Sequence, residues 1–252
     1  KLVRPFLEIP KTRFIKILSI TNLEWISDPS NFSSDYKRSR IRKILPILSK
    51  EGINSKQIGL VIKRMRSAKD ALNTQTNILL KKYLSNVDNV AYFLNKELLK
   101  DVKEKEILLR VLEKIFMNIS GSIYPPRRNK LENIISWILK NNNIKAKTLT
   151  GVVVRKRKSE LIFYREPDDC YKSVNIRPLT SRYSCWDDRF FLKANKSNDL
   201  QIRALGDVGI KILKEEKILK RQGFQNVPLS AWKTVPGVWS KKRLISVPTL
   251  GY

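Results

Sequence analysis

The chain has 252 residues, of which 51 are lysine or arginine and 23 are aspartate or glutamate, giving a formal net charge of +28 at pH 7. Such an excess repels itself in a compact chain unless a polyanion neutralises it, so nucleic acid is the expected partner; an anionic membrane surface, an acidic protein or no specific partner are the alternatives. The sequence has no histidine and only two cysteines, without a CxxC pair, which argues against a metal site and a disulfide scaffold. It also has no apolar run of about 18 residues, which argues against a membrane span. These features favour a cytoplasmic protein.

The first part of the chain predicts an extended piece, a helix and a turn. Leu2–Leu7 is typical of a strand that runs into a loop, and Pro10 opens a helix with apolar residues at helical spacing. Asp28-Pro29-Ser30-Asn31 predicts a turn, because the residue before a proline avoids the helical region and Ser and Asn favour turns.

A basic helix is expected after this turn, capped by Ser33 or Ser34. Its expected buried stripe consists of Ile41, Ile44, Leu45 and Leu48. Arg38 and Arg42 lie four residues apart and share another face, where like charges repel slightly. That face is either a solvated basic surface or a site for a phosphate or carboxylate.

Residues 55–143 predict helices, with a short extended stretch expected at Val90–Leu94. Ser55 is expected to cap a long helix with Ile58, Val61, Ile62 and Met65 inward and a basic band outward, which a solvated face would equally explain. Asp101, with Glu104 three residues on, is expected to cap a second helix that ends at Gly121. Pro125-Pro126-Arg127-Arg128 leads into a third, so this region is predicted to be an all-helical subdomain.

The hydrophobic period then changes to alternation. Residues 148–155 and 160–165 predict a β-hairpin whose basic tip either grips phosphate or only solubilises the chain. Polar residues 168–184 predict a loop-like linker. Asp187 and Asp188 predict a turn, or an ion pair with Arg189, rather than a metal site, because neighbours on a strand point to opposite faces.

The C-terminal residues predict a small unit of strands and a helix. Leu200–Leu205 is expected to form a strand, and a helix is expected from Gly206 to Gly223. A second hairpin is predicted around Ser240–Arg243.

Several motifs together resemble one family. Arg4-Pro5-Phe6-Leu7, Asp28-x-Ser30-Asn31, Tyr36-x-Arg38-x-x-Ile41-Arg42 and Leu45-Pro46 are similar to the end of the catalytic domain of the tRNA(Ile)-lysidine synthases, a family of PP-loop ATPases. Two positions depart from the pattern: Ser33 stands where an Asp is usual, and Ser39 where an Asn is usual. The Pro-Pro-Arg before a helix, the strand pair at 151–167 and the ending Pro248-Thr249-Leu250-Gly251-Tyr252 also resemble the family.

The resemblance implies an α+β, multidomain fold. Residues 1–50 would be the end of an α/β PP-loop catalytic domain, and residues 51–167 a mainly helical tRNA-binding domain closed by a β-hairpin. Residues 168–185 would be a linker, and residues 186–252 a small α+β C-terminal domain.

The resemblance also implies a ligase. In the family, ATP with Mg²⁺ adenylates C2 of the wobble cytidine (C34) of an isoleucine tRNA, and the amine of free lysine displaces AMP to give lysidine. The ATP-binding motif of the family, S-G-G-x-D-S, lies upstream of the position of Arg4 and is not found in this sequence. We therefore expect the chain alone to bind tRNA without catalysing, with a homodimer possible. A non-catalytic basic RNA-binding module, for example one associated with the ribosome, is the alternative.

The candidate site residues follow from the matched motifs and the basic segments. By resemblance, the group near the active site is Asp28, Ser30, Asn31, Arg38 and Arg42. The candidate tRNA-binding residues are Arg4, Lys63, Arg64, Arg127, Arg128, Arg155, Lys156, Arg157, Lys158, Lys241, Lys242 and Arg243. Such bases would follow the RNA backbone and give affinity rather than sequence choice.

Overall fold

The structure, a computed structural model, places the chain in two compact units, residues 1–68 and 69–252. It describes residues 3–6, 9–21, 23–24, 26, 28, 33–140, 144–173, 177–179, 183–193, 200–218 and 226–252. Within the described ranges the fold mixes helices with three open sheets.

The first unit contains α1 (Lys11–Ile20), α2 (Lys37–Lys50) and the beginning of α3 (Ser55–Tyr83). The prediction of a buried stripe along α2 was wrong for Ile41 and Ile44, whose exposed fractions are 47% and 48%. The inward face predicted for the start of α3 was also wrong, since Met65 is 70% exposed. Helical spacing identifies an apolar face, but the described residues of this unit supply no second layer to cover it.

The helix starts in this unit differ from those predicted. Asn54, not Ser55, caps α3: the Gln57 amide N–H donates to Asn54 Oδ1 at 3.0 Å, and the Asn54 N–H donates to Gln57 Oε1 at 3.4 Å. This reciprocal pair is a capping box. The predicted cap of α2 at Ser33 or Ser34 was also wrong. Tyr36 occupies the N-cap position and makes no side-chain cap hydrogen bond, and Ser33 bonds to Asp35 instead.

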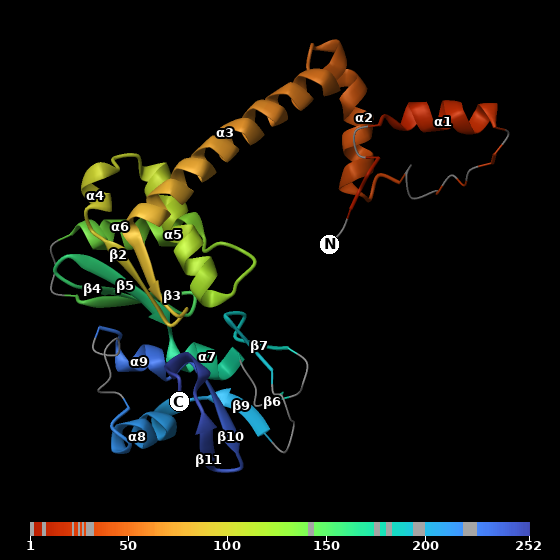
Figure 1. The fold of residues 1–252 in the computed structure, drawn as a ribbon. Coiled ribbons are helices and arrows are strands. Elements are labelled where there is room, and N and C mark those ends of the chain that lie inside the picture. The colour runs from red at the N-terminus through yellow and green to blue at the C-terminus, as the bar shows by residue number, and fades with distance from the viewer. Residues whose placement is uncertain are drawn as a thin grey trace. The chain divides into compact units, whose positions relative to one another are not determined.

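The second unit is built on a five-stranded antiparallel sheet (Figure 1). Its order is β1-β2-β5-β4-β3, with strands β1 (Leu84–Val87), β2 (Ala91–Asn95), β3 (Ala146–Leu149), β4 (Val152–Lys156) and β5 (Glu160–Arg165). The predicted hairpin is confirmed as β4–β5. The extended stretch predicted at Val90–Leu94 is confirmed as β2, but the all-helical prediction was wrong, because Asp88-Asn89 adopt positive φ and join β2 to a further strand, β1. Thr150-Gly151 likewise have positive φ and join β3 to β4.

Three helices belong to the same part of this unit: α4 (Leu98–Asp101), α5 (Lys105–Ser120) and α6 (Arg128–Leu139). The apolar stripe of α5 is buried as expected, and Phe116 meets Phe163 of β5 edge-to-face with ring centroids 6.0 Å apart. Gly121 ends α5 with φ +66°, as predicted. The predicted cap at Asp101 was wrong: Asp101 ends α4, and its carboxylate accepts a hydrogen bond from the Tyr83 hydroxyl.

The C-terminal part of the second unit begins with α7 (Pro167–Ser173), inside the segment predicted to be a linker. That prediction of loop structure was wrong, because Cys170 is fully buried there and anchors the helix. A four-stranded sheet follows in the order β11-β10-β9-β6, with β6 (Arg177–Pro178), β9 (Leu200–Ala204), β10 (Pro236–Ser240) and β11 (Arg243–Ser246). The strand at 200–205 and the second hairpin are thereby confirmed.

The remaining elements complete this part. They are the hairpin of β7 (Ser184–Trp186) and β8 (Phe190–Leu192), the helices α8 (Gly206–Glu215) and α9 (Leu229–Trp232), and the short 3-10 helix η3 (Pro248–Leu250). The predicted helix to Gly223 was wrong: α8 ends at Glu215, Lys217 has φ +59°, and Gly223 lies outside the described residues.

Each face of the five-stranded sheet has its own core. Val152, Val154 and Phe163 belong to the core that α5 and α6 share, whereas Phe93, Ile162 and Tyr164 face the other way. The second set packs in one cluster with residues of the C-terminal part such as Trp186 and Trp239. The sheet is therefore a central layer between the helices and the C-terminal part. No described helix is long and apolar enough to cross a membrane.

Candidate functional site

The candidate group near the active site lies in the first unit. Arg38 and Arg42 are exposed on α2, one helical turn apart, and Asp28 is exposed ahead of it. Ser30 and Asn31 lie outside the described residues. The structure therefore leaves the two guanidinium groups on a surface, where the geometry suits a phosphate contact as well as solvent.

Arg40, which was not among the candidate site residues, organises the start of α2. Its Nη1 donates to the carbonyl oxygens of Ser34 and Asp35 at 2.8 and 3.0 Å. Lys43 donates to Ser34 Oγ at 2.7 Å. Ser33 Oγ donates to the Asp35 carboxylate at 2.8 Å, so the Ser that replaces the usual Asp takes part in this turn. Ser39, at the other departing position, is the buried residue of α2.

Most of the candidate RNA-binding side chains are exposed. They are Arg4, Lys63 and Arg64 in the first unit and Arg127, Arg128, Arg155, Lys158, Lys241, Lys242 and Arg243 in the second. Lys156 and Arg157, in the basic tip of the β4–β5 hairpin, are only half exposed. The tip is therefore not a uniform cluster of free cations.

Lys156 instead serves the end of α6. Its ammonium group donates to the carbonyl oxygens of Trp137 and Lys140 at 2.6 and 2.8 Å and lies 4.5 Å from the Trp137 ring centroid. Carbonyls at a helix C-terminus lack partners within the helix and attract a cation. Burial lowers the pKa of Lys156, and the neighbouring Lys96 and Lys147 lower it further.

The β4–β5 loop is fixed from within the protein. Lys96 Nζ donates to the carbonyl oxygens of Arg157 and Lys158, and Arg157 Nη2 donates to the carbonyl oxygen of Asn226 at 2.8 Å. Arg157 Nη1 also bonds to Glu160 at 3.1 Å. Arg155, near the end of β4, and Lys158, in the loop, are the exposed bases here.

Arg128, at the start of α6, is also paired. It bonds to Glu106 of α5 at 2.8 Å and to Glu132 at 3.3 Å. Because its side chain is 61% exposed, it can still present part of its guanidinium outward. Arg127, one residue earlier, is exposed.

A polar cleft of about 440 Å³ lies beside the edge strand β1. Lys81, Lys82, Ser85, Asn95 and Ser159 contribute to its lining. The Lys82 ammonium group pairs with Asp101 at 3.4 Å. The cleft thus presents one ion-paired lysine, a second lysine and neutral polar groups, with the Glu160 carboxylate also in its lining.

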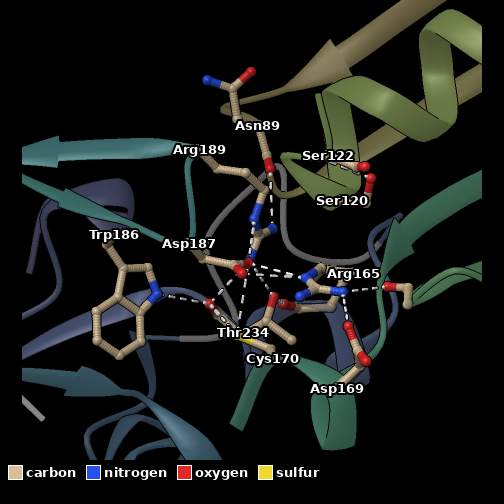
Figure 2. Close-up of polar contacts among 12 residues, drawn as sticks. Asn89, Ser120, Ser122, Arg165, Asp169, Cys170, Trp186, Asp187, Arg189 and Thr234 are labelled. Atoms are coloured by element: carbon tan, nitrogen blue, oxygen red, sulfur yellow. Dashed lines mark hydrogen bonds and ion pairs between the residues drawn. The ribbon is translucent and has the colours of Figure 1, made fainter. Parts of the chain in front are cut away.

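The strongest concentration of buried charge lies at the β7–β8 turn (Figure 2). Asp187 Oδ2 accepts hydrogen bonds from Arg189 Nε at 2.8 Å and from Arg165 Nε at 3.1 Å, and it pairs with Arg189 Nη2 at 2.7 Å. All three side chains are almost fully buried, with exposed fractions of 3%, 1% and 4% respectively. The predicted turn and the predicted ion pair with Arg189 are both confirmed: Asp187 and Asp188 have φ of 49° and 51°.

Further polar groups complete this cluster. Arg165 Nη1 donates to the Gly151 carbonyl oxygen at 2.9 Å and pairs with Asp169 of α7. Arg189 Nη2 donates to the carbonyl and hydroxyl oxygens of Thr234, both at 3.1 Å. Burial is the first cause that raises the pKa of the Cys170 thiol to about 12, and the neighbouring Asp187 carboxylate adds to it. Among the described residues, no group of three or more His, Cys, Asp or Glu side chains is placed to hold a metal ion.

The comparisons with known proteins agree with the motifs. A family model described as a PP-loop domain matches residues 1–48. The tRNA(Ile)-lysidine synthase of Ruegeria pomeroyi is 28% identical over 250 residues, which is 99% of this chain and 56% of that protein. That of Rickettsia typhi is 26% identical over 258 residues, 100% of this chain and 58% of the relative.

A third relative, the tRNA(Ile)-lysidine synthase of Wolbachia sp. subsp. Brugia malayi, is 30% identical over 189 residues, 75% of this chain and 43% of that protein. The chain thus spans a little over half the length of the relatives that it matches end to end. With the motifs near Arg4, Asp28 and Arg38, these matches show that the chain belongs to the tRNA(Ile)-lysidine synthase family of PP-loop proteins.

Proposed function

We propose that this chain is part of a tRNA-modifying ligase that uses ATP to attach lysine to C2 of the wobble cytidine, C34, of an isoleucine tRNA, in the cytoplasm. The observation that carries the proposal is similarity along essentially the whole chain to proteins named tRNA(Ile)-lysidine synthase. The net charge of +28 supports a polyanionic substrate.

The proposed chemistry has two steps. The C2 oxygen of the cytidine attacks the α-phosphate of ATP and releases pyrophosphate. The amine of lysine then attacks C2 and displaces AMP, so that a C–N bond replaces the C–O bond. In this proposal Asp28, Ser30, Asn31, Arg38 and Arg42 border the nucleotide site, with the guanidinium groups facing phosphate. The sequence does not contain S-G-G-x-D-S, so the ATP-dependent step needs a polypeptide that carries this motif.

The proposed role of the second unit is to hold the tRNA. Its exposed bases on the β4–β5 hairpin (Arg155, Lys158), at the start of α6 (Arg127) and on the β10–β11 turn (Lys241, Lys242, Arg243) would contact backbone phosphates. Lys156 and Arg157 are assigned a smaller part, because their donors already bond to carbonyl oxygens of the protein.

Binding of unmodified isoleucine tRNA tests this role. The double variant Lys241→Glu, Lys242→Glu should weaken binding by about 1 kcal/mol per lost phosphate contact and flatten its salt dependence. Lys211→Glu, Lys214→Glu on exposed positions of α8 changes the charge equally and is the control. Equal weakening by both pairs would mean that the β10–β11 turn makes no local contact.

Lysine incorporation tests the catalytic part of the proposal. The chain alone is expected to bind tRNA without incorporating radioactive lysine, and addition of a polypeptide with the S-G-G-x-D-S motif should restore incorporation. Incorporation by the chain alone would refute the assignment of the ATP site elsewhere.

The second candidate function is a non-catalytic RNA-binding module, which the strongly basic composition alone would also explain. Competition separates the two: bulk tRNA should displace isoleucine tRNA poorly from a ligase component and fully from a general RNA-binding module.

A further inference from the structure

The buried charge cluster around Asp187 lies where the C-terminal part of the second unit meets the five-stranded sheet. Arg165 ends β5 of that sheet, whereas Asp187 and Arg189 belong to the β7–β8 hairpin. Arg189 Nη1 also reaches the carbonyl oxygen of Asn89, in the β1–β2 turn, at 3.3 Å. Polar contacts thus cross the junction at two places, and Figure 2 shows Asn89 and Arg189 above Asp187 and Arg165 to its right.

The charges of the cluster pair across the junction. Two buried guanidinium groups share one buried carboxylate, that of Asp187, and the half-exposed Asp169 of α7 also pairs with Arg165. A buried charge that loses its partner is strongly unfavourable, so this arrangement tolerates one geometry. The apolar cluster that the two parts share imposes no such directional requirement, because the free energy of apolar burial is non-directional and roughly proportional to the buried area.

Two glycines confirm how closely the junction fits. A Cβ at Gly121, the C-cap of α5, would lie 2.6 Å from Asp188 Cβ, so only glycine lets the helix end touch the β7–β8 turn. A Cβ at Gly151 would overlap Arg165 Nη1 and the Asp169 carboxylate. Both glycines also have positive φ, of +66° and +70°. Backbone and side chains therefore fix the same relative position of the two parts.

We infer that Asp187 is a positioning residue: by holding Arg165 and Arg189 together, it locks the C-terminal part onto the five-stranded sheet in one orientation. This orientation sets the spacing between the bases of the β4–β5 hairpin and those of the β10–β11 turn. A large folded RNA presents its phosphates at fixed spacings. A fixed orientation of the two parts would let both basic surfaces contact the same RNA molecule at once. The RNA consequence rests on the proposed function, whereas the locking itself does not.

The locking is tested by a distance measurement on the full chain. Spin labels on Ser136→Cys of α6 and Lys211→Cys of α8, both exposed positions, report the separation of the two parts in a Cys185→Ser background. The chain with Asp187 intact should give one narrow distance distribution, and Asp187→Asn a broad or shifted one. Asp188→Asn is the matched control, because it lies in the same turn, is exposed and changes the net charge equally.

If Asp187→Asn does not fold, Arg189→Lys serves as the second variant. A lysine keeps the positive charge beside Asp187 but cannot reach the Asn89 and Thr234 oxygens together. It should broaden the distribution while the far-UV circular dichroism stays unchanged. Narrow, unshifted distributions in the folded variants would overturn the inference, whatever the RNA results.

The RNA consequence has its own readout. Asp187→Asn should weaken binding of full-length isoleucine tRNA by about tenfold relative to Asp188→Asn, and binding of a short RNA hairpin by less than about twofold. Equal loss for both RNAs would show that the variant damages a local contact and would contradict the positioning role. No binding of either RNA by the unsubstituted chain would refute the proposed function and leave the distance test standing.

Discussion

The two cysteines occupy different surroundings, and their chemistry should differ accordingly. Cys170 is fully buried in α7, where burial raises the pKa of its thiol to about 12, whereas Cys185 is partly exposed in β7. The thiolate is the reactive form, so both burial and the raised pKa protect Cys170.

A thiol titration checks this difference. At pH 8 a disulfide reagent such as DTNB should modify one thiol of the native chain quickly, and the second only after unfolding in guanidinium chloride. Cys185→Ser should abolish the fast reaction. Rapid modification of two thiols in the native chain would contradict the buried position of Cys170.

Glu106 on α5 links α5 to the start of α6, and this link depends on pH. The hydrogen bond from Arg128 is the first cause that lowers the pKa of Glu106 below its ordinary value of 4.5, and Arg110 lowers it further. The unfolded chain therefore binds protons at a higher pH than the folded one. The stabilisation that the ionised Glu106 contributes is fully present above about pH 4.5, and it is lost as the pH falls through the lowered pKa of Glu106 in the folded chain.

Urea unfolding between pH 3 and 7 checks this sign. Glu106→Gln should lower the free energy of unfolding near neutral pH and leave it less dependent on pH in the acid range. The effect should be a few tenths of a kcal/mol, because the pair is largely exposed. Glu113→Gln, on the same helix and without an ion pair among the described residues, should leave the profile unchanged.

Among the single elements, α3 shows how an N-cap can be misassigned: its cap is Asn54, one residue before the Ser55 that the sequence suggested. Serine is a good N-cap, so Ser55 was the natural prediction, but Asn54 and Gln57 satisfy each other's backbone N–H groups. Asn54→Ala should therefore destabilise the first turn of α3 by about 1 kcal/mol.

Ser55→Ala is the matched substitution and should be neutral or slightly stabilising, since alanine is the better helix former. Hydrogen exchange of the amides in the first turn of α3 distinguishes the two variants. Faster exchange in the Ser55 variant than in the Asn54 variant would restore the original assignment of the cap.

Long apolar patterns and the more apolar short strands, β2 and β9, were readable from the sequence, whereas the polar strand β1 was not. The stripe of α5 and the β4–β5 alternation both extend over enough residues to define a period. β1 has the sequence Leu-Ser-Asn-Val, and its strand conformation depends on pairing with β2. Asp187 and Arg189 are near neighbours in sequence, so their ion pair could be predicted from the sequence. Arg165 is 22 residues from Asp187 and joins them only through the tertiary fold.

At the scale of the whole second unit, the parts on either side of α7 share one core. Ile162 and Tyr164 of the five-stranded sheet pack in the same cluster as Trp186 and Trp239 of the C-terminal part. The sequence suggested two domains and a linker, because a polar segment that forms a helix at a junction cannot be distinguished from a loop by composition.

The shared core predicts a single cooperative unit. Native-state hydrogen exchange should give the most protected amides of α5 and of β10 the same free energy of opening, because neither part keeps its apolar surface covered without the other. Cutting the chain within α7 should expose Phe93 and Ile162 and cause both halves to aggregate. Independent opening of β10 well below the value for α5 would show separate domains.

The set of buried charges also limits how this protein can change during evolution. Replacing Asp187 alone leaves two buried guanidinium groups without the buried carboxylate that they share, whereas replacing either arginine alone leaves Asp187 paired with the other. Asp187 should therefore be retained wherever both arginines are present, and sequences that replace only Asp187 should be rare.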